Sequence, residues 1–204
     1  MKIGIFGGSF NPPHKMHKWI AKELIKKGYL DKVIFVPTGI KYEYKTNLIA
    51  NEKRVNMLSL MIEKEKNMTV SKYELQPRPV YTYQTLNHFS KKYKKDDIYF
   101  ICGTDNLSYI DKWKEKGKIL NNYKILVIKR DTNKIEPLLE KYKNYRQNII
   151  VTTMKEKSIS STMIRTYLKQ NNSLKARLYI DKKVYNYIKH NHLYEDKEES
   201  IYHP

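Results

Sequence analysis

The chain has 204 residues, of which 40% are hydrophobic, and a formal net charge of +19, and its length fits one domain. No apolar run approaches the ~18 residues that span a bilayer, and the N-terminus lacks a signal peptide's apolar segment and cleavage site, so we expect a cytoplasmic or nuclear protein, neither secreted nor membrane-bound. Its lysines are spread along the chain and its arginines are few, whereas nucleic-acid-binding modules cluster their positive charge and favour Arg. We therefore expect the chain to attract small anions such as nucleotides and to have no dedicated nucleic-acid partner.

Short apolar runs rich in β-branched and aromatic residues recur along the chain and predict buried strands. Cys102 lies in the fourth run, so we expect this single cysteine to be buried; it cannot form an intrachain disulfide. The runs lie at residues 3–6, 32–37, 68–71, 98–103, 124–129 and 148–153.

Helical patterns alternate with these strands. One apolar stripe runs through Trp19, Ile20, Leu24 and Ile25, and further helices are predicted around residues 55–62, 82–89 and 161–168. Strands that alternate with helices predict an α/β fold, a Rossmann-like, doubly wound parallel sheet. We place it in a single domain at residues 1–194, followed by a polar tail at 195–204. Ligands of such folds bind beyond the carboxyl ends of the strands.

The first predicted strand runs directly into the string GGSFNPPHKMH, residues 7–17. Gly7 and Gly8 permit positive φ angles and a close approach of the backbone to a ligand. A helix is predicted to begin near His14 or Lys15, and its N-terminal N–H groups and dipole favour phosphate. His14 and His17 project from the same side of its first turn. Their spacing alone leaves two other roles open. The histidines could be a pair of metal ligands, although no third ligand lies nearby in the sequence, or they could have a purely structural role.

Several strings in the chain match the motifs of a known family. GGSFNPPHKMH resembles the first signature of the nucleotidyltransferase superfamily, G-[ST]-F-x-P-x-H-x-G-H, and ISSTMIR at 159–165 resembles the second. The strings VPTGIKYEYK, NEKRVNML, SKYELQPRPVYTYQTL, FICGTDNLSYIDKW and VIKR are similar to segments of bacterial-type nicotinate/nicotinamide mononucleotide adenylyltransferases. The resemblance spans roughly residues 1 to 190 with few gaps.

The resemblance implies adenylyl transfer from ATP to nicotinate mononucleotide, with nicotinamide mononucleotide as a secondary substrate and Mg²⁺ bound through the ATP phosphates rather than by a protein metal site. It implies catalytic roles for His14, His17 and Arg165. The implied contacts of ATP and its phosphates are Gly7, Gly8, Ser9, Phe10, Met16, Lys45, Gly103, Asp105, Ile159, Ser160, Ser161 and Thr162. Arg54 would hold phosphate as well.

By the same resemblance, Trp113 stacks on the pyridine ring, and Tyr81, Thr82 and Arg130 complete that pocket. Lys112 and Lys114 flank Trp113, and their charge favours the carboxylate of nicotinate over the amide. Met16 stands where the family has Gly; we expect its adaptable side chain to fold over the adenosine as an apolar contact.

Simpler roles stay open for several of these residues. Trp113 on an amphipathic helix is often a core residue, the serines at 160 and 161 and Asp105 are natural helix caps, and Lys45 fits a solvated surface. Another transferase of the superfamily, of the pantetheine-phosphate or cytidylyl type, is an alternative function, as is a catalytically weak nucleotide-binding regulator. The sequence leaves the oligomeric state open, a homo-oligomer included.

Overall fold

The computed structural model describes residues 1–39, 48–130, 135–156 and 159–195. Within those residues the chain forms a six-stranded parallel sheet in the order β3-β2-β1-β4-β5-β6. The strands are β1 Lys2–Gly8, β2 Lys32–Pro37, β3 Met68–Val70, β4 Asp97–Gly103, β5 Lys124–Arg130 and β6 Ile149–Glu156. All the predicted strands are confirmed, as is the doubly wound fold.

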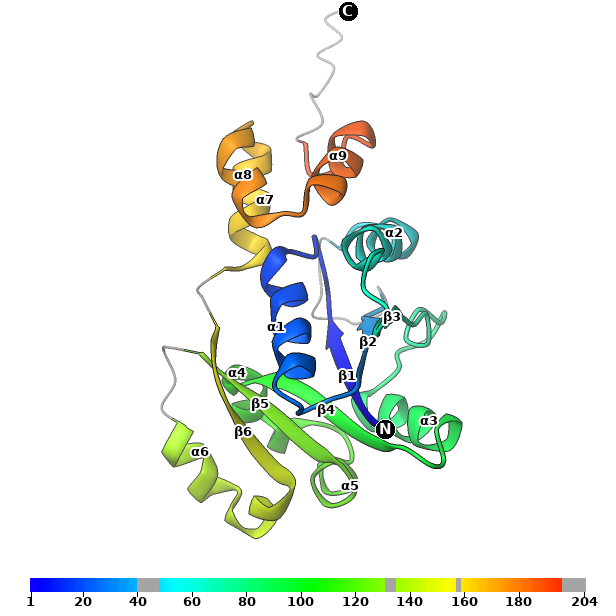
Figure 1. Cartoon of the computed structure of the whole chain (residues 1–204), viewed down its shortest axis with the longest axis vertical. Helices are drawn as coiled ribbons and strands as arrows, with labels where there is room; N and C mark the ends of the chain where they lie inside the picture. The colour runs from blue at the N-terminus through cyan, green and yellow to red at the C-terminus, as the bar shows by residue number, and fades with distance from the viewer. Residues whose placement is uncertain (40–47, 131–134, 157–158, 196–204) are drawn as a thin grey trace, which may run out of the picture.

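Helices cover both faces of the sheet (Figure 1). The helices are α1 Lys15–Lys26, α2 Asn51–Ile62, α3 Thr82–Lys92, α4 Thr104–Tyr109, α5 Lys116–Asn122, α6 Ile135–Lys141, α7 Ser161–Lys169, α8 Ser173–Tyr179 and α9 Lys182–His190, with short 3₁₀ turns at Ile110–Lys112 and Lys143–Asn148. One hydrophobic core joins α1, α2 and α7 to α9 to one face of the sheet, and a second joins α3 to α6 to the other. A strand that is buried on both faces of a sheet is usually a continuous apolar run. This explains why the central strands could be predicted from the sequence.

The apolar stripe of α1 is narrower than expected. Ile20 and Leu24 are buried at 3% and 0% exposure, whereas the Trp19 side chain is 37% exposed. Trp19 was placed on the apolar stripe, but it lies outside the buried part of that stripe because α1 turns this position outward. Cys102 is buried as predicted, and burial raises the pKa of its thiol.

The carboxyl end of the sheet is where the chain gathers its later helices. Figure 1 shows α7, α8 and α9 at the end toward which β1 runs. The winding direction reverses between β1 and β4, because β2 and β3 extend to one side of β1 and β5 and β6 lie beyond β4. Such a switch point leaves a crevice outside the strand ends. Among the described helices, none has the length and apolarity to cross a membrane.

Candidate active site

Two cavities of about 590 Å³ each lie at this switch point, a volume typical of small-molecule sites. Gly7, Gly8 and Asn106 line both, so the cavities meet at the ends of β1 and β4. We call one the histidine cavity; its other principal lining residues are Ser9, Phe10, Asn11, His17, Cys102, Gly103, Asp105, Ser161, Thr162 and Arg165. We call the other the tryptophan cavity; it is lined also by Thr38, Glu74, Tyr81, Thr82, Thr85, Lys112, Trp113 and Lys114.

The loop after β1 forms the wall between sheet and cavity, and its backbone differs from the expectation. Neither Gly7 nor Gly8 has a positive φ; the left-handed residue is Phe10, at φ 47°. A Cβ at Gly8 would lie 3.0 Å from the Phe10 ring, whereas one at Gly7 would meet no protein atom within 4 Å. Gly8 thus makes room for Phe10, and Gly7 leaves the cavity open for a ligand.

Phe10 holds its left-handed backbone through its buried ring. The ring packs edge-on against Phe6, Phe35 and His17, with centroids 5.9, 5.7 and 4.9 Å away. A non-glycine residue in this region of φ/ψ space is uncommon and persists when its surroundings fix it. The packing of Phe10 therefore helps to set the shape of the histidine cavity.

Side chains from distant elements hold the same loop by its carbonyl groups. Arg54 of α2 donates to the carbonyls of Ser9 at 2.8 Å and Thr38 at 2.6 Å. Arg165 donates to the carbonyl of Asn11 at 2.8 Å. The Ser161 hydroxyl donates to the carbonyl of Pro12 at 2.8 Å.

Arg54 is a structural residue in this arrangement. It has 0% exposure, and it also donates to the Ile49 carbonyl and the Asn51 side chain. Burial lowers the pKa of its guanidinium. The expectation that Arg54 binds phosphate is corrected: its guanidinium donates hydrogen bonds to backbone carbonyl oxygens and lines neither cavity.

The two histidines do lie on one side of the first turn of α1, with their rings stacked at 3.6 Å between centroids. His14 caps the helix and is 3% exposed, and its backbone N–H donates to Nδ1 of His17 at 3.1 Å. Because Nδ1 of a neutral His17 accepts this bond, the ring proton lies on Nε2, which is then a donor. His17 lines the histidine cavity, whereas His14, which was also predicted to be catalytic, does not.

The start of α7 supplies the opposite wall. Ser160 is its N-cap and accepts from the backbone N–H of Met163 at 3.1 Å, so the capping role left open for it is present. Ser161, Thr162 and Arg165 line the cavity, and Arg165 also donates to the Thr162 hydroxyl at 3.1 Å. The helix start and the guanidinium together provide a wall of hydrogen-bond donors.

The end of β4 contributes the predicted Gly103 and Asp105, with Asp105 on the first turn of α4. Asn106, exposed and shared by both cavities, was missed by the sequence analysis although it follows Asp105 directly.

Trp113, Tyr81 and Thr82 come together in the tryptophan cavity as predicted. Trp113 lies just beyond a 3₁₀ turn rather than on a long amphipathic helix, and it packs edge-on against Phe100 with centroids 5.8 Å apart. Lys112 and Lys114 line the same cavity, and the Lys114 ammonium lies 4.8 Å from the Tyr81 ring centroid. The cavity therefore combines an aromatic wall with positive charge.

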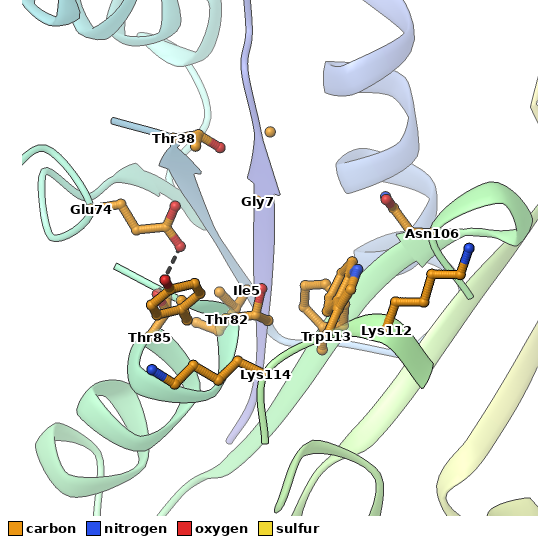
Figure 2. Close-up of a pocket in the computed structure, with 13 residues that line it drawn as sticks. Ile5, Gly7, Thr38, Glu74, Thr82, Thr85, Asn106, Lys112, Trp113 and Lys114 are labelled. Carbon is orange, nitrogen blue, oxygen red and sulfur yellow. Dashed lines mark hydrogen bonds between the residues drawn. The ribbon is translucent and has the colours of Figure 1, made fainter. Parts of the chain in front are cut away.

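The far wall of this cavity was missed. Figure 2 shows Glu74 on the side of β1 opposite Trp113, accepting a hydrogen bond from the Thr85 hydroxyl. That bond measures 2.7 Å, and Glu74 is 8% exposed. Glu74 belongs to the string SKYELQPRP that carried part of the resemblance, and Thr38 follows β2 directly, so position in a motif and at a strand end could have indicated both.

Other predicted site residues lie elsewhere. Met16 is 5% exposed and packs in the core on the α1 side of the sheet, so it lines neither cavity, contrary to the expectation that it folds over the adenosine. Ile159 also packs against that core. Lys45 and the Arg130 side chain lie outside the described part of the structure.

The comparisons with known proteins agree with this geometry. The family model described as Cytidylyltransferase-like matches residues 5–167. A Plasmodium falciparum nicotinic acid mononucleotide adenylyltransferase complexed with NaAD superposes with a TM-score of 0.81 over 95% of this chain and 97% of the other. At 22% identity this likeness establishes the fold alone.

Sequence relatives narrow the family further. A probable nicotinate-nucleotide adenylyltransferase of Clostridium acetobutylicum is 37% identical over 199 residues, covering 95% of this chain and 98% of the relative. One from Carboxydothermus hydrogenoformans is 36% identical over 198 residues, covering 95% and 98%. The chain therefore belongs to the cytidylyltransferase-like family and, within it, to the nicotinate-nucleotide adenylyltransferases.

Proposed function

We propose that this chain transfers the adenylyl group of ATP to nicotinate mononucleotide, forming the dinucleotide and pyrophosphate. The observation that carries the proposal is the pair of equal cavities meeting at Gly7, Gly8 and Asn106. One cavity offers donors for phosphates and the other offers an aromatic wall. A reaction that joins two nucleotides through their phosphates needs such an arrangement, with the reacting groups at the junction.

ATP occupies the histidine cavity in this proposal. The Arg165 guanidinium neutralises phosphate charge, and Nε2 of His17 and the N–H groups at the start of α7 donate hydrogen bonds to phosphate oxygens. Asp105 accepts hydrogen bonds from ribose hydroxyls. The lining of one cavity by all these groups supports the assignment.

The mononucleotide occupies the tryptophan cavity, with its pyridine ring on Trp113. Lys112 and Lys114 favour the carboxylate of nicotinate, so nicotinamide mononucleotide is the slower substrate. Glu74 and Thr85 face this cavity as a hydrogen-bonded pair and suit the ribose hydroxyls of the mononucleotide.

The chemistry needs alignment and charge neutralisation rather than a general base. A phosphate monoester has a second pKa near 6 and is largely dianionic at pH 7. One of its oxygens attacks the α-phosphorus of ATP, a new P–O–P bond forms, and the bond to the β-phosphate oxygen breaks to release pyrophosphate. His17 and Arg165 hold the charge that develops on the transferring and leaving phosphates.

Mg²⁺ is the cation we expect with ATP. Among the described residues, no three His, Cys, Asp or Glu side chains lie together as a metal site. One carboxylate, Asp105, lines the histidine cavity, which fits a cation carried mainly by phosphates and water. When bound, it would neutralise phosphate charge.

Pyrophosphate release tests the proposal. The wild-type chain is assayed with ATP and Mg²⁺ and one acceptor at a time: nicotinate mononucleotide, nicotinamide mononucleotide, phosphopantetheine or phosphocholine. We expect the fastest release with nicotinate mononucleotide, slower release with the amide and background rates with the others. Fastest release with phosphopantetheine or phosphocholine would assign the chain to another branch of the superfamily, and background rates throughout would favour the regulator.

A further inference from the structure

The chain after α9 returns to the loop that follows β1. Leu193 closes the end of α9 by donating its backbone N–H to the Ile188 carbonyl at 3.0 Å. His192 and Tyr194 both have positive φ angles, 50° and 65°, which turn the chain back on itself. The turn brings Tyr194 to Asn11, 183 positions earlier in the sequence.

The Tyr194 hydroxyl donates a hydrogen bond to Oδ1 of Asn11 at 2.8 Å. The ring is half-buried against the core formed with α1, α2 and α7 to α9. Burial raises the pKa of the phenol well above that of an exposed tyrosine, an effect opposed in part by Arg165 and Arg54. The phenol therefore keeps its proton at neutral pH and remains a donor.

Asn11 is the point at which this bond reaches the site. It is 3% exposed yet lines the histidine cavity. Its backbone carbonyl is held by Arg165 at 2.8 Å, so Tyr194 and Arg165 hold one residue by its side chain and its main chain. The preceding residue, Phe10, has the unfavourable left-handed backbone, which makes the loop dependent on contacts that fix it.

We propose that Tyr194 is a positioning residue for the ATP site, holding the Ser9–Asn11 loop in its ligand-binding shape through Asn11. This inference rests on the proposed function only in naming ATP as the occupant of the histidine cavity. It makes the segment after the last helix part of the site. Nothing in the local sequence around Tyr194 indicates this role.

Tyr187 of α9, the helix that precedes Tyr194, offers a matched control. It is also partly buried against the same core, and its hydroxyl accepts a hydrogen bond from Asn56 at 3.0 Å. It lines neither cavity. Tyr187→Phe and Tyr194→Phe therefore each delete one side-chain hydrogen bond of the phenol, and only the second touches the loop.

The experiment measures the dissociation constant of Mg²⁺–ATP by calorimetry without an acceptor, beside the melting temperature. One hydrogen bond contributes about 0.5–1.5 kcal/mol, which corresponds to about a two- to tenfold change in a dissociation constant, so we expect Tyr194→Phe to weaken ATP binding by more than twofold and by up to about tenfold. Tyr187→Phe should change it less than twofold, while both variants lower the melting temperature by a similar few degrees. Tyr194→Phe binding ATP within twofold of wild type would overturn the proposal.

A double-mutant cycle tests the route through Asn11. In the Asn11→Ala background, Tyr194→Phe should add less than a twofold change in ATP binding, because the partner of the phenol is gone. An undiminished effect in that background would also overturn the proposal. Because these readouts need no acceptor, they stand apart from the acceptor assay, whose failure would concern the proposed reaction alone.

Discussion

The two cavities are built in different ways. The loop of the histidine cavity is held by Arg54, Ser161, Arg165 and Tyr194, which come from α2, α7 and the segment after α9. The tryptophan cavity takes most of its side chains from one stretch of chain, residues 74–114. Its lysines are exposed, and the Trp113 ring packs edge-on against Phe100.

This difference separates two tasks. Donors aimed at developing charge are effective when they are fixed before the substrate arrives, and the long-range hydrogen bonds of the histidine cavity supply that rigidity. The tryptophan cavity has to recognise one ring and its carboxylate, for which an aromatic face and nearby charge suffice. Changes in the histidine cavity should therefore affect turnover, and changes in the tryptophan cavity should affect the choice and affinity of the acceptor.

The largest effect is expected from His17→Ala. Loss of a donor that stabilises the transition state typically lowers turnover ~10²–10³-fold, and we expect a fall of this size in kcat with the melting temperature little changed. Trp19→Ala, on the same helix but 37% exposed and outside both cavities, is the control. Steady-state kinetics with kcat of His17→Ala within threefold of wild type would remove His17 from the mechanism.

Arg54→Met should affect both cavities at once, because Arg54 holds Ser9 beside one and Thr38 beside the other. Leaving buried carbonyls without donors costs about 1–3 kcal/mol each, so we expect the free energy of unfolding to fall by about 3 kcal/mol. The KM values for ATP and for the mononucleotide should both rise. Urea denaturation and kinetics measure these effects, with the exposed Ser59→Ala of the same helix as control; a rise in one KM alone would restrict Arg54 to one cavity.

Much of this architecture could be predicted from the sequence. Most strands could be predicted because they contain a short apolar run, and helices α1, α2, α3 and α7 could be predicted because their apolar stripes persist over two turns or more. Helices α4, α5, α6 and α8 were missed because six or seven residues carry little periodic signal, and α9 was missed although it has nine residues, as many as α7.

The site was predictable where it followed a strand and carried a motif. Glycines 7 and 8, His17, Arg165 and Trp113 reached the cavities as expected. Side-chain direction was not predictable: Met16 turned into the core, and Arg54 turned to the backbone. Contacts such as Tyr194 with Asn11 depend on how the last helices pack, which no local pattern encodes.

Trp113→Ala should act on the acceptor. Stacking on an aromatic face contributes about 1–3 kcal/mol per base, so we expect KM for nicotinate mononucleotide to rise roughly tenfold or more while KM for ATP changes less than twofold. Equal rises in both constants would return Trp113 to a packing role against Phe100.

The smallest effect is expected from the lysines beside Trp113. Exposed charges are screened and contribute well below 1 kcal/mol each, so Lys112→Gln combined with Lys114→Gln should lower kcat/KM for the nicotinate form about threefold and leave the amide form unchanged. The effect should shrink in high salt. Lys116→Gln, exposed and outside the cavity, is the control, and an equal loss for both acceptors would exclude a role in reading the carboxylate.

The assignment of one nucleotide to each cavity is tested most directly by calorimetric binding of three ligands to two variants. The ligands are Mg²⁺–ATP, nicotinate mononucleotide and the dinucleotide product, and the variants are His17→Ala and Trp113→Ala. We expect His17→Ala to weaken ATP and the dinucleotide only, and Trp113→Ala to weaken the mononucleotide and the dinucleotide only. Weakened ATP binding in Trp113→Ala, or weakened mononucleotide binding in His17→Ala, beyond threefold would contradict the assignment.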